Sequence, residues 1–172
     1  MAPLDVTPPI SLRIAAAADV PQLAELFRVT VLQHGPQYYT AQQTAAWAAA
    51  ADDRDRFQQF ILSVTTYLAV NKSNILGFAG IGSDGYVASA YVHHRHLGQG
   101  VGSALMAQIL DHAKRDRLPR LYCEASKFSV GLFTQFGFHL YTTEVVERHG
   151  VAFKRYLMEK LMANRNTDAD SP

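Results

Sequence analysis

The chain has 172 residues, of which 48% are hydrophobic and 18% charged, and its formal net charge is +1. Such a composition is typical of a single soluble globular domain, and the absence of a long basic run argues against nucleic-acid binding as the main role. The lone cysteine, Cys123, excludes an internal disulfide. The chain starts without the charged and apolar regions of a signal peptide, and no run approaches the roughly 18 apolar residues of a membrane helix. We therefore expect a cytoplasmic protein with neither nucleic-acid nor membrane partners.

Hydrophobic periodicity and turn residues divide the chain into helices and strands. Asp19 and Thr40 are residue types that cap helices, and Gly35-Pro36 interrupts the helical pattern between them. In chain order, the predicted elements are a strand at 12–15, a helix that starts at 19, a helix at 40–50, a turn or helix at 53–62, strands at 65–70, 75–81 and 86–92, a helix at 101–115, a strand at 121–124, a short helix at 129–136, and a hairpin of strands 138–147 and 151–158 around His149-Gly150.

This order of elements favours one domain over residues 11–160. Residues 1–10 form an extension before it. Residues 161–172 form a polar tail after it, which we expect to be flexible.

Three alternating glycines, Gly98, Gly100 and Gly102, lie between a predicted strand and a predicted helix. Such a turn can hold a pyrophosphate, because its backbone N–H groups and the positive end of the helix dipole point at the same place. Glycine permits the close approach and the positive φ angles that this geometry needs. The spacing does not fit the dinucleotide fingerprint, and no lysine precedes Ser103 as a P-loop requires.

Two ordered motifs point to one family. Residues 92–105 resemble the cofactor motif of the GNAT superfamily of N-acetyltransferases, Arg/Gln-x-x-Gly-x-Gly/Ala, and residues 132–138 resemble its later Leu-Tyr-x-x-x-Gly-Phe. Residues 38–48 and 146–156 are similar to the bacterial YafP-like subgroup. The chain is thus identified as a GNAT member over residues 11–160.

The resemblance implies an α/β (layered α+β) GNAT fold, with a central, mixed, mostly antiparallel twisted sheet of about seven strands flanked by about four helices. The fourth and fifth strands of that fold splay apart, and the pantetheine arm of acetyl-CoA lies in the gap. The implied function is transfer of an acetyl group from acetyl-CoA directly to a primary amine of a small molecule or peptide. A module that binds acyl-CoA with little turnover, or an enzyme that acetylates protein N-termini or lysines, stays open. Homodimers are common in the superfamily, so a homodimer also stays open.

The resemblance also assigns roles to residues. Glu124, at the end of the fifth strand, is the candidate general base, with a surface or ion-paired glutamate as the alternative. Tyr39 with Tyr38 and Trp47 would form a wall of the acceptor site, or simply pack between helices. The backbone amides of the fourth strand would pair with the pantetheine. The residues expected to contact acetyl-CoA are Tyr91, Val92, Leu97, Gly98, Gln99, Gly100, Val101, Gly102, Ser103, Ser126 and Phe133.

Several positions depart from the family pattern. Leu97 replaces the usual Arg/Gln, so Gln99 or Arg95 would have to compensate, and Ala88 stands where the subgroup tends to have Asp. Phe133 replaces the tyrosine that protonates the thiolate in many relatives, which leaves Tyr91, Tyr122 and Ser126 as weak alternative donors. His93, His94 and His96 lack an acidic or cysteine partner at ligand spacing, so we expect solvated loop residues and no metal. Cys123 is expected to be a small core residue rather than a nucleophile.

Overall fold

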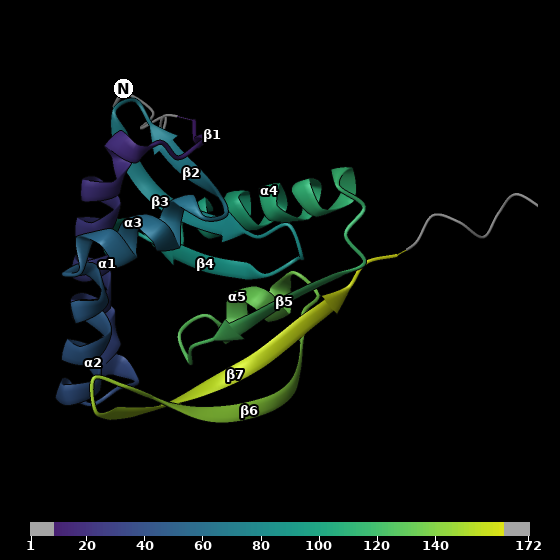
Figure 1. Ribbon diagram of the computed structural model, residues 1–172. Helices are drawn as coiled ribbons and strands as arrows, with labels where there is room; N and C mark the ends of the chain where they lie inside the picture. The colour runs from purple at the N-terminus through teal and green to yellow at the C-terminus, as the bar shows by residue number, and fades with distance from the viewer. Residues whose placement is uncertain (1–8, 164–172) are drawn as a thin grey trace, which may run out of the picture.

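The computed structural model describes residues 9–163, and the expectations for the first eight residues and for residues 164–172 lie outside that range. Two antiparallel sheets with helices packed around them make up the fold (Figure 1). Within the described residues there are seven strands and five α-helices, one helix more than the family pattern implied. No described helix is long and apolar enough to span a membrane.

The first sheet has the order β1-β2-β3-β4, with each neighbouring pair antiparallel. Its two faces are covered by different helices. One apolar core joins the sheet to α4 (Val101–Arg115), and a second joins it to the three helices that lie between β1 and β2 in the chain. Its strands alternate between these cores, as period-2 side-chain geometry requires. The strands are β1 (Ser11–Ile14), β2 (Thr65–Asn71), β3 (Asn74–Ile81) and β4 (Val87–Val92).

Three helices stand between β1 and β2, namely α1 (Val20–His34), α2 (Ala41–Ala48) and α3 (Arg54–Leu62). The predicted cap at Thr40 is confirmed, because its hydroxyl accepts a hydrogen bond from the Gln43 N–H at 3.1 Å and the Gln43 side chain accepts one in return. Asp53 likewise caps α3, which settles the choice between turn and helix there.

The expectation for Asp19 needs a correction. It is the residue before α1, but its carboxylate makes no capping bond to that helix. Instead it accepts hydrogen bonds from the Ala16 N–H and from the Arg13 guanidinium, each at 2.8 Å. Asp19 therefore ties the end of β1 to the start of α1.

The second sheet has the order β5-β7-β6 and contains the C-terminal hairpin. Its strands are β5 (Arg120–Ala125), β6 (His139–Arg148) and β7 (Val151–Leu161), and β7 runs three residues further than the periodicity predicted. The reason is pairing with β5, in which Arg120 lies opposite Leu161 and forms an ion pair with Glu159. Two more helices, α4 (Val101–Arg115) and α5 (Val130–Gln135), precede β5 and β6. Single 3-10 turns occur at Ala17–Asp19, Gly35–Gln37, Ala49–Ala51 and His94–His96.

The two sheets meet at one point. A single parallel bridge joins Tyr86 to Tyr122, and the Tyr122 N–H donates to the Gly85 carbonyl at 3.1 Å. Beyond that bridge β4 and β5 pair no further, so the expected central sheet is divided into two and its fourth and fifth strands splay apart (Figure 1). The divergence leaves one edge of β4 unpaired.

Candidate active site

A cavity of about 760 Å³ lies beside the point where β4 and β5 diverge. Its walls come from β4, the end of β5, helices α1 to α3, the segment around α5 and the β6–β7 hairpin. The hairpin is fastened to α2, because the Gln43 side-chain amide donates to the Ala152 carbonyl at 2.9 Å. Segments far apart in the chain thus enclose a single space, which we call the cleft.

Glu124 lies on the wall of the cleft, as its position at the end of β5 predicted. The alternation of β5 explains this: Leu121, Cys123 and Ala125 are buried in the core, while Glu124 points to the opposite face and is half-buried. Tyr86 borders the cleft together with Glu124. Burial, followed by the effects of the Glu124 carboxylate, raises the pKa of Tyr86, so its hydroxyl stays protonated.

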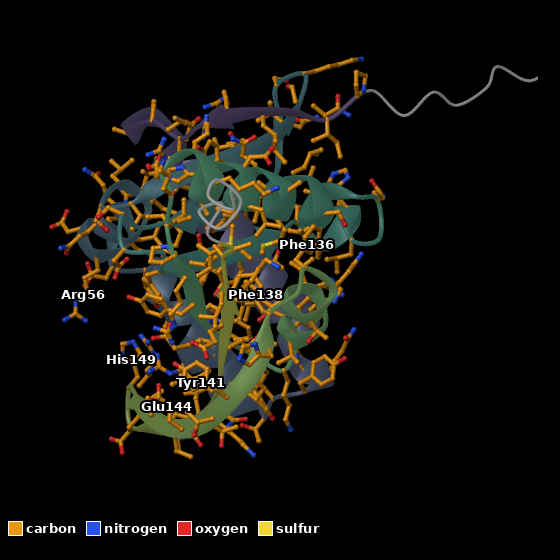
Figure 2. All side chains as sticks on the ribbon, turned by 90° about the vertical axis from the view of Figure 1, so that its right-hand side faces the viewer. Arg56, Phe136, Phe138, Tyr141, Glu144 and His149 are labelled. Atoms are coloured by element: carbon orange, nitrogen blue, oxygen red, sulfur yellow. The ribbon has the colours of Figure 1, made fainter. Side chains whose placement is uncertain are left out.

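Arg155 completes this group of charges. Leu157 is the β7 partner of Glu124, and Arg155, two residues before it, is therefore the diagonal cross-strand neighbour of Glu124. The guanidinium of Arg155 is held in turn by Glu144 of β6, with Nε 2.9 Å from Oε1. In Figure 2, the labelled side chains of Tyr141, Glu144 and His149 mark the course of β6 toward the hairpin turn.

Sequence reasoning missed Tyr86 and Arg155. The signal for Tyr86 was its place directly after a turn at the start of a strand, opposite the strand of Glu124. For Arg155 no local signal existed, since its distance from Glu124 is set by the β5–β7 register.

The unpaired edge of β4 offers backbone groups to a ligand. The His93 N–H donates to the Leu76 carbonyl at 2.8 Å, and Tyr91 lies opposite Phe78. In an antiparallel ladder the direction of the N–H groups alternates, so the N–H of Val92 points to the open edge and that of Tyr91 points to β3. The geometry favours Val92 over Tyr91 as the amide that meets a pantetheine.

The glycine turn has the backbone that the sequence predicted. Gly98 and Gly100 have φ angles of +71° and +84°, and a Cβ added to either would meet nothing within 4 Å. Gly100 precedes α4 without a side-chain cap, so the first N–H groups of α4, from Val101, Gly102 and Ser103, have no capping side chain as partner. A left-handed turn with open space above it and uncapped N–H groups behind it fits a pyrophosphate.

The side chains of the turn divide into two groups. Gln99 is not free to replace the missing Arg/Gln of position 97, because its amide donates to the Arg95 carbonyl and its oxygen lies 3.2 Å from Nδ1 of His96. Arg95 is exposed, and its guanidinium has no partner within the described residues. Of the two substitutes that the sequence suggested for Leu97, the structure leaves Arg95 available.

The histidines differ from the expectation of solvated loop residues. His93 and His94 are half-buried, with their rings stacked at a centroid distance of 4.4 Å. Burial is the main cause that lowers the pKa of each imidazole, and neighbouring positive groups add to it. The backbone N–H of His94 lies 3.2 Å from the Thr30 hydroxyl oxygen, so this segment is fastened to α1. Within residues 9–163 no group of three or more His, Cys, Asp or Glu side chains is placed to hold a metal ion.

Phe133 and Ser126 border the cleft, but neither is a free donor. Phe133 is only 4% exposed and packs edge-on against Phe138, so its ring belongs to the core as well as to the wall. The Ser126 hydroxyl lies 3.2 Å from that of Ser129. Tyr122, another donor suggested by the sequence, is bound to Asp84 and does not border the cleft.

Of the three aromatic residues expected at the acceptor site, Tyr39 and Trp47 border the cleft and Tyr38 does not. Tyr38 is 50% exposed, lies outside the cleft and packs against Phe128. Trp47 also packs between elements, since its indole N–H donates to the Tyr91 hydroxyl at 3.3 Å. Tyr39 accepts a hydrogen bond from the Lys127 N–H at 3.0 Å, which fixes its ring.

The family model of the acetyltransferase (GNAT) domain matches residues 36–160. The chain belongs to the GNAT acetyltransferase family. It is 25% identical over 149 residues to the uncharacterized N-acetyltransferase YafP of Escherichia coli strain K12, a match that covers 87% of this chain and 94% of that protein. The GNAT acetyltransferase is therefore YafP-like, as two of its segments predicted.

Solved structures place the same domain among N-acetyltransferases. A GCN5-related N-acetyltransferase from Rhodopseudomonas palustris matches with a TM-score of 0.85 and 25% identity, over 89% of this chain and 96% of that one. A PaiA N-acetyltransferase from Thermoplasma acidophilum, whose structure is a complex with coenzyme A, matches with a TM-score of 0.74 and 14% identity, over 90% and 99% of the two chains. At that identity the second match supports the GNAT fold alone.

Proposed function

We propose that this GNAT acetyltransferase moves an acetyl group from acetyl-CoA directly to a primary amine of a small molecule or peptide. The observation that carries the proposal is the placement of Glu124 on the wall of the cleft, beside the open edge of β4. A carboxylate there faces the space that an amine would enter, while the glycine turn lies at the far end of the same strand.

The residues around the turn suit acetyl-CoA. The N–H groups of Val101, Gly102 and Ser103 would hold the pyrophosphate, with Gly98 and Gly100 giving it room. The Val92 N–H, on the open edge of β4, would pair with the pantetheine arm or donate to the thioester carbonyl. Acetyl-CoA itself supplies an activated acetyl group with a thiolate as its leaving group. The solved PaiA complex with coenzyme A is consistent with this assignment.

Glu124 has a defined task in this reaction. Attack requires a neutral amine, and for a lysine-type amine with a pKa of about 10.4 the cost of neutrality at pH 7 is roughly 4.6 kcal/mol. The carboxylate of Glu124 would accept the proton, directly or through a water. The protonated hydroxyl of Tyr86, which borders the same cleft, would help to orient that carboxylate. An α-amino group, with a pKa of about 8, needs much less help.

Of the residues that could protonate the leaving thiolate, Phe133 is apolar and the hydroxyls of Ser126 and Tyr122 are engaged. The Tyr91 hydroxyl accepts the Trp47 N–H, and its own proton has no acceptor in the described residues, but we assign it no role in the departure of the thiolate. A thiol with a pKa of about 8.5 is a tolerable leaving group without protonation. The mechanism we propose therefore depends on a base and on backbone donors rather than on an acid.

The test measures thiol release from acetyl-CoA with a panel of amines for the wild type, Glu124→Gln and a control, Glu25→Gln, at an exposed glutamate of α1 outside the cleft. We expect transfer by the wild type and the control, and its loss in Glu124→Gln while acetyl-CoA still binds. Binding is followed by the melting temperature: at about 1 mM ligand and a Kd of about 10 μM the stabilisation is about 2.7 kcal/mol. Full activity of Glu124→Gln would refute the base assignment.

Two other outcomes correspond to the alternatives. Tight binding without turnover across the panel would favour an acyl-CoA-binding module. Turnover only with protein N-termini or lysines would favour a protein acetyltransferase.

A further inference from the structure

The inner face of the β6–β7 hairpin carries two arginines. Arg148 lies opposite Val151 and Glu144 opposite Arg155, and paired residues project to the same side of a sheet. The buried Phe153 lies between these pairs on that side, which therefore faces the cleft, while Val145 and Lys154 are exposed on the other side. Both arginines border the cleft.

Only one of these arginines is neutralised. The guanidinium of Arg155 forms an ion pair with Glu144. Arg148 has no acidic partner among residues 9–163, and its neighbour Glu147 projects to the opposite face of the strand. On the far wall of the cleft, Arg56 is already near Asp53, with Nε 3.7 Å from its carboxylate. The unpaired positive charge at the hairpin end of the cleft is thus Arg148.

A second hydrogen-bond donor, without an acceptor among residues 9–163, borders the same cleft as Arg148. The Tyr91 hydroxyl accepts the Trp47 N–H, but its own proton has no acceptor in the described part of the chain. Burial is the main cause that raises the pKa of Tyr91 to about 12, and the positive charge of Arg148 acts in the opposite direction. Tyr91 therefore remains a donor, and it borders the same cleft as Arg148.

These two donors lie away from the base. Glu124 is level with Leu157 of β7, whereas Arg148 is level with Val151. Six residues of strand span about 20 Å. An extended peptide covers about 3.3–3.6 Å per residue, so the two ends of a peptide of about six residues match this separation.

We propose that the acceptor is an amine that also carries a carboxylate, of the size of a short peptide, with its amine at Glu124 and its carboxylate held by Arg148 and the Tyr91 hydroxyl. The inference rests on the proposed acetyl transfer. It narrows the acceptor from amines in general to those with an anionic group at the other end. A charge-assisted bond to a guanidinium is among the stronger polar contacts available for such recognition.

The test compares peptides of about five to seven residues that have a free N-terminal amine and end in either a carboxylate or a carboxamide. We expect the wild type to prefer the acids in kcat/KM on the order of tenfold. In Arg148→Gln the two forms should be used equally, and Arg148→Lys should restore part of the preference. Lys154→Gln removes a positive charge from the outer face of the same hairpin and should keep the full preference.

Equal use of acid and amide by the wild type, or a preference that survives in Arg148→Gln, would overturn the inference. Binding of the N-acetylated peptides, measured by calorimetry, separates it from the proposed function because it needs no turnover. An Arg148-dependent preference for the acids without any turnover would reject acetyl transfer and retain the carboxylate site. Turnover without a preference in either measurement would retain acetyl transfer and reject the carboxylate site.

Discussion

The substitution Gly100→Ala should lower the affinity for acetyl-CoA much more than it lowers the stability of the fold. The φ angle of Gly100 is +84°, and a Cβ there would meet nothing within 4 Å. In the protein without ligand, the substitution therefore costs only the strain of a left-handed backbone. That strain is about 1–2 kcal/mol for an L-residue. In a domain of this size it lowers the melting temperature by about 2–8 °C.

Binding of acetyl-CoA should fall much further. The added methyl group would occupy the open space in front of the first N–H groups of α4, where we expect the pyrophosphate. Losing one hydrogen bond to a charged group costs about 1.5–3 kcal/mol, which corresponds to a weakening of roughly 10- to 150-fold. Isothermal titration of acetyl-CoA measures this directly.

Gly150→Ala is the matched control. Gly150 has a φ of +73°, and a Cβ there also meets nothing within 4 Å, but it lies in the turn between β6 and β7. We expect a similar fall in melting temperature with unchanged acetyl-CoA affinity. If Gly100→Ala bound acetyl-CoA as tightly as Gly150→Ala does, the assignment of the turn to the pyrophosphate would be wrong.

Three further predictions address other parts of the molecule. Tyr86→Phe removes the hydroxyl that acts on the Glu124 carboxylate and should lower kcat on the order of tenfold with little change in the KM for acetyl-CoA, whereas a fall in kcat with an equally large rise in that KM would indicate misfolding. Cys123 is 2% exposed and burial raises its pKa to about 12, so thiol reagents should modify it only on unfolding, and rapid modification of the native protein would contradict its place in the core. The Arg13 guanidinium holds the pKa of Asp19 at about 2, below its usual 3.8, so its contribution is complete above about pH 4 and is lost as the pH falls toward 2. Asp19→Asn should therefore lower the free energy of unfolding by about 1 kcal/mol at pH 7 and by almost nothing near pH 2 in urea titrations, a modest value because Arg13 is 46% exposed.

Local patterns were sufficient where the physical cause is local. The cap at Thr40 and the left-handed glycines of the turn depend on a few neighbouring residues, and the structure has them as predicted. Glu124 was singled out by the resemblance, and the alternation of side chains along β5 explains why it borders the cleft.

Resemblance to the family supplied what local patterns lack, namely the splay of β4 and β5. It did not supply directions of side chains. Tyr38 and Tyr39 are adjacent, yet only Tyr39 borders the cleft, because the chain between α1 and α2 turns one ring inward and the other outward.

The sequence by itself determined most of the elements, their order and the glycine turn, because periodicity, caps and turn chemistry act over a few residues, and the resemblance of two of its motifs indicated the family. Only the tertiary structure decided which charges meet. Tyr86 reaches Glu124 from another strand, Arg155 is placed by the register of β7, and Arg148 is left unpaired because Glu147 projects to the other face of the hairpin. Such contacts depend on strand register and on the divergence of two sheets, which are set by packing between residues distant in the chain.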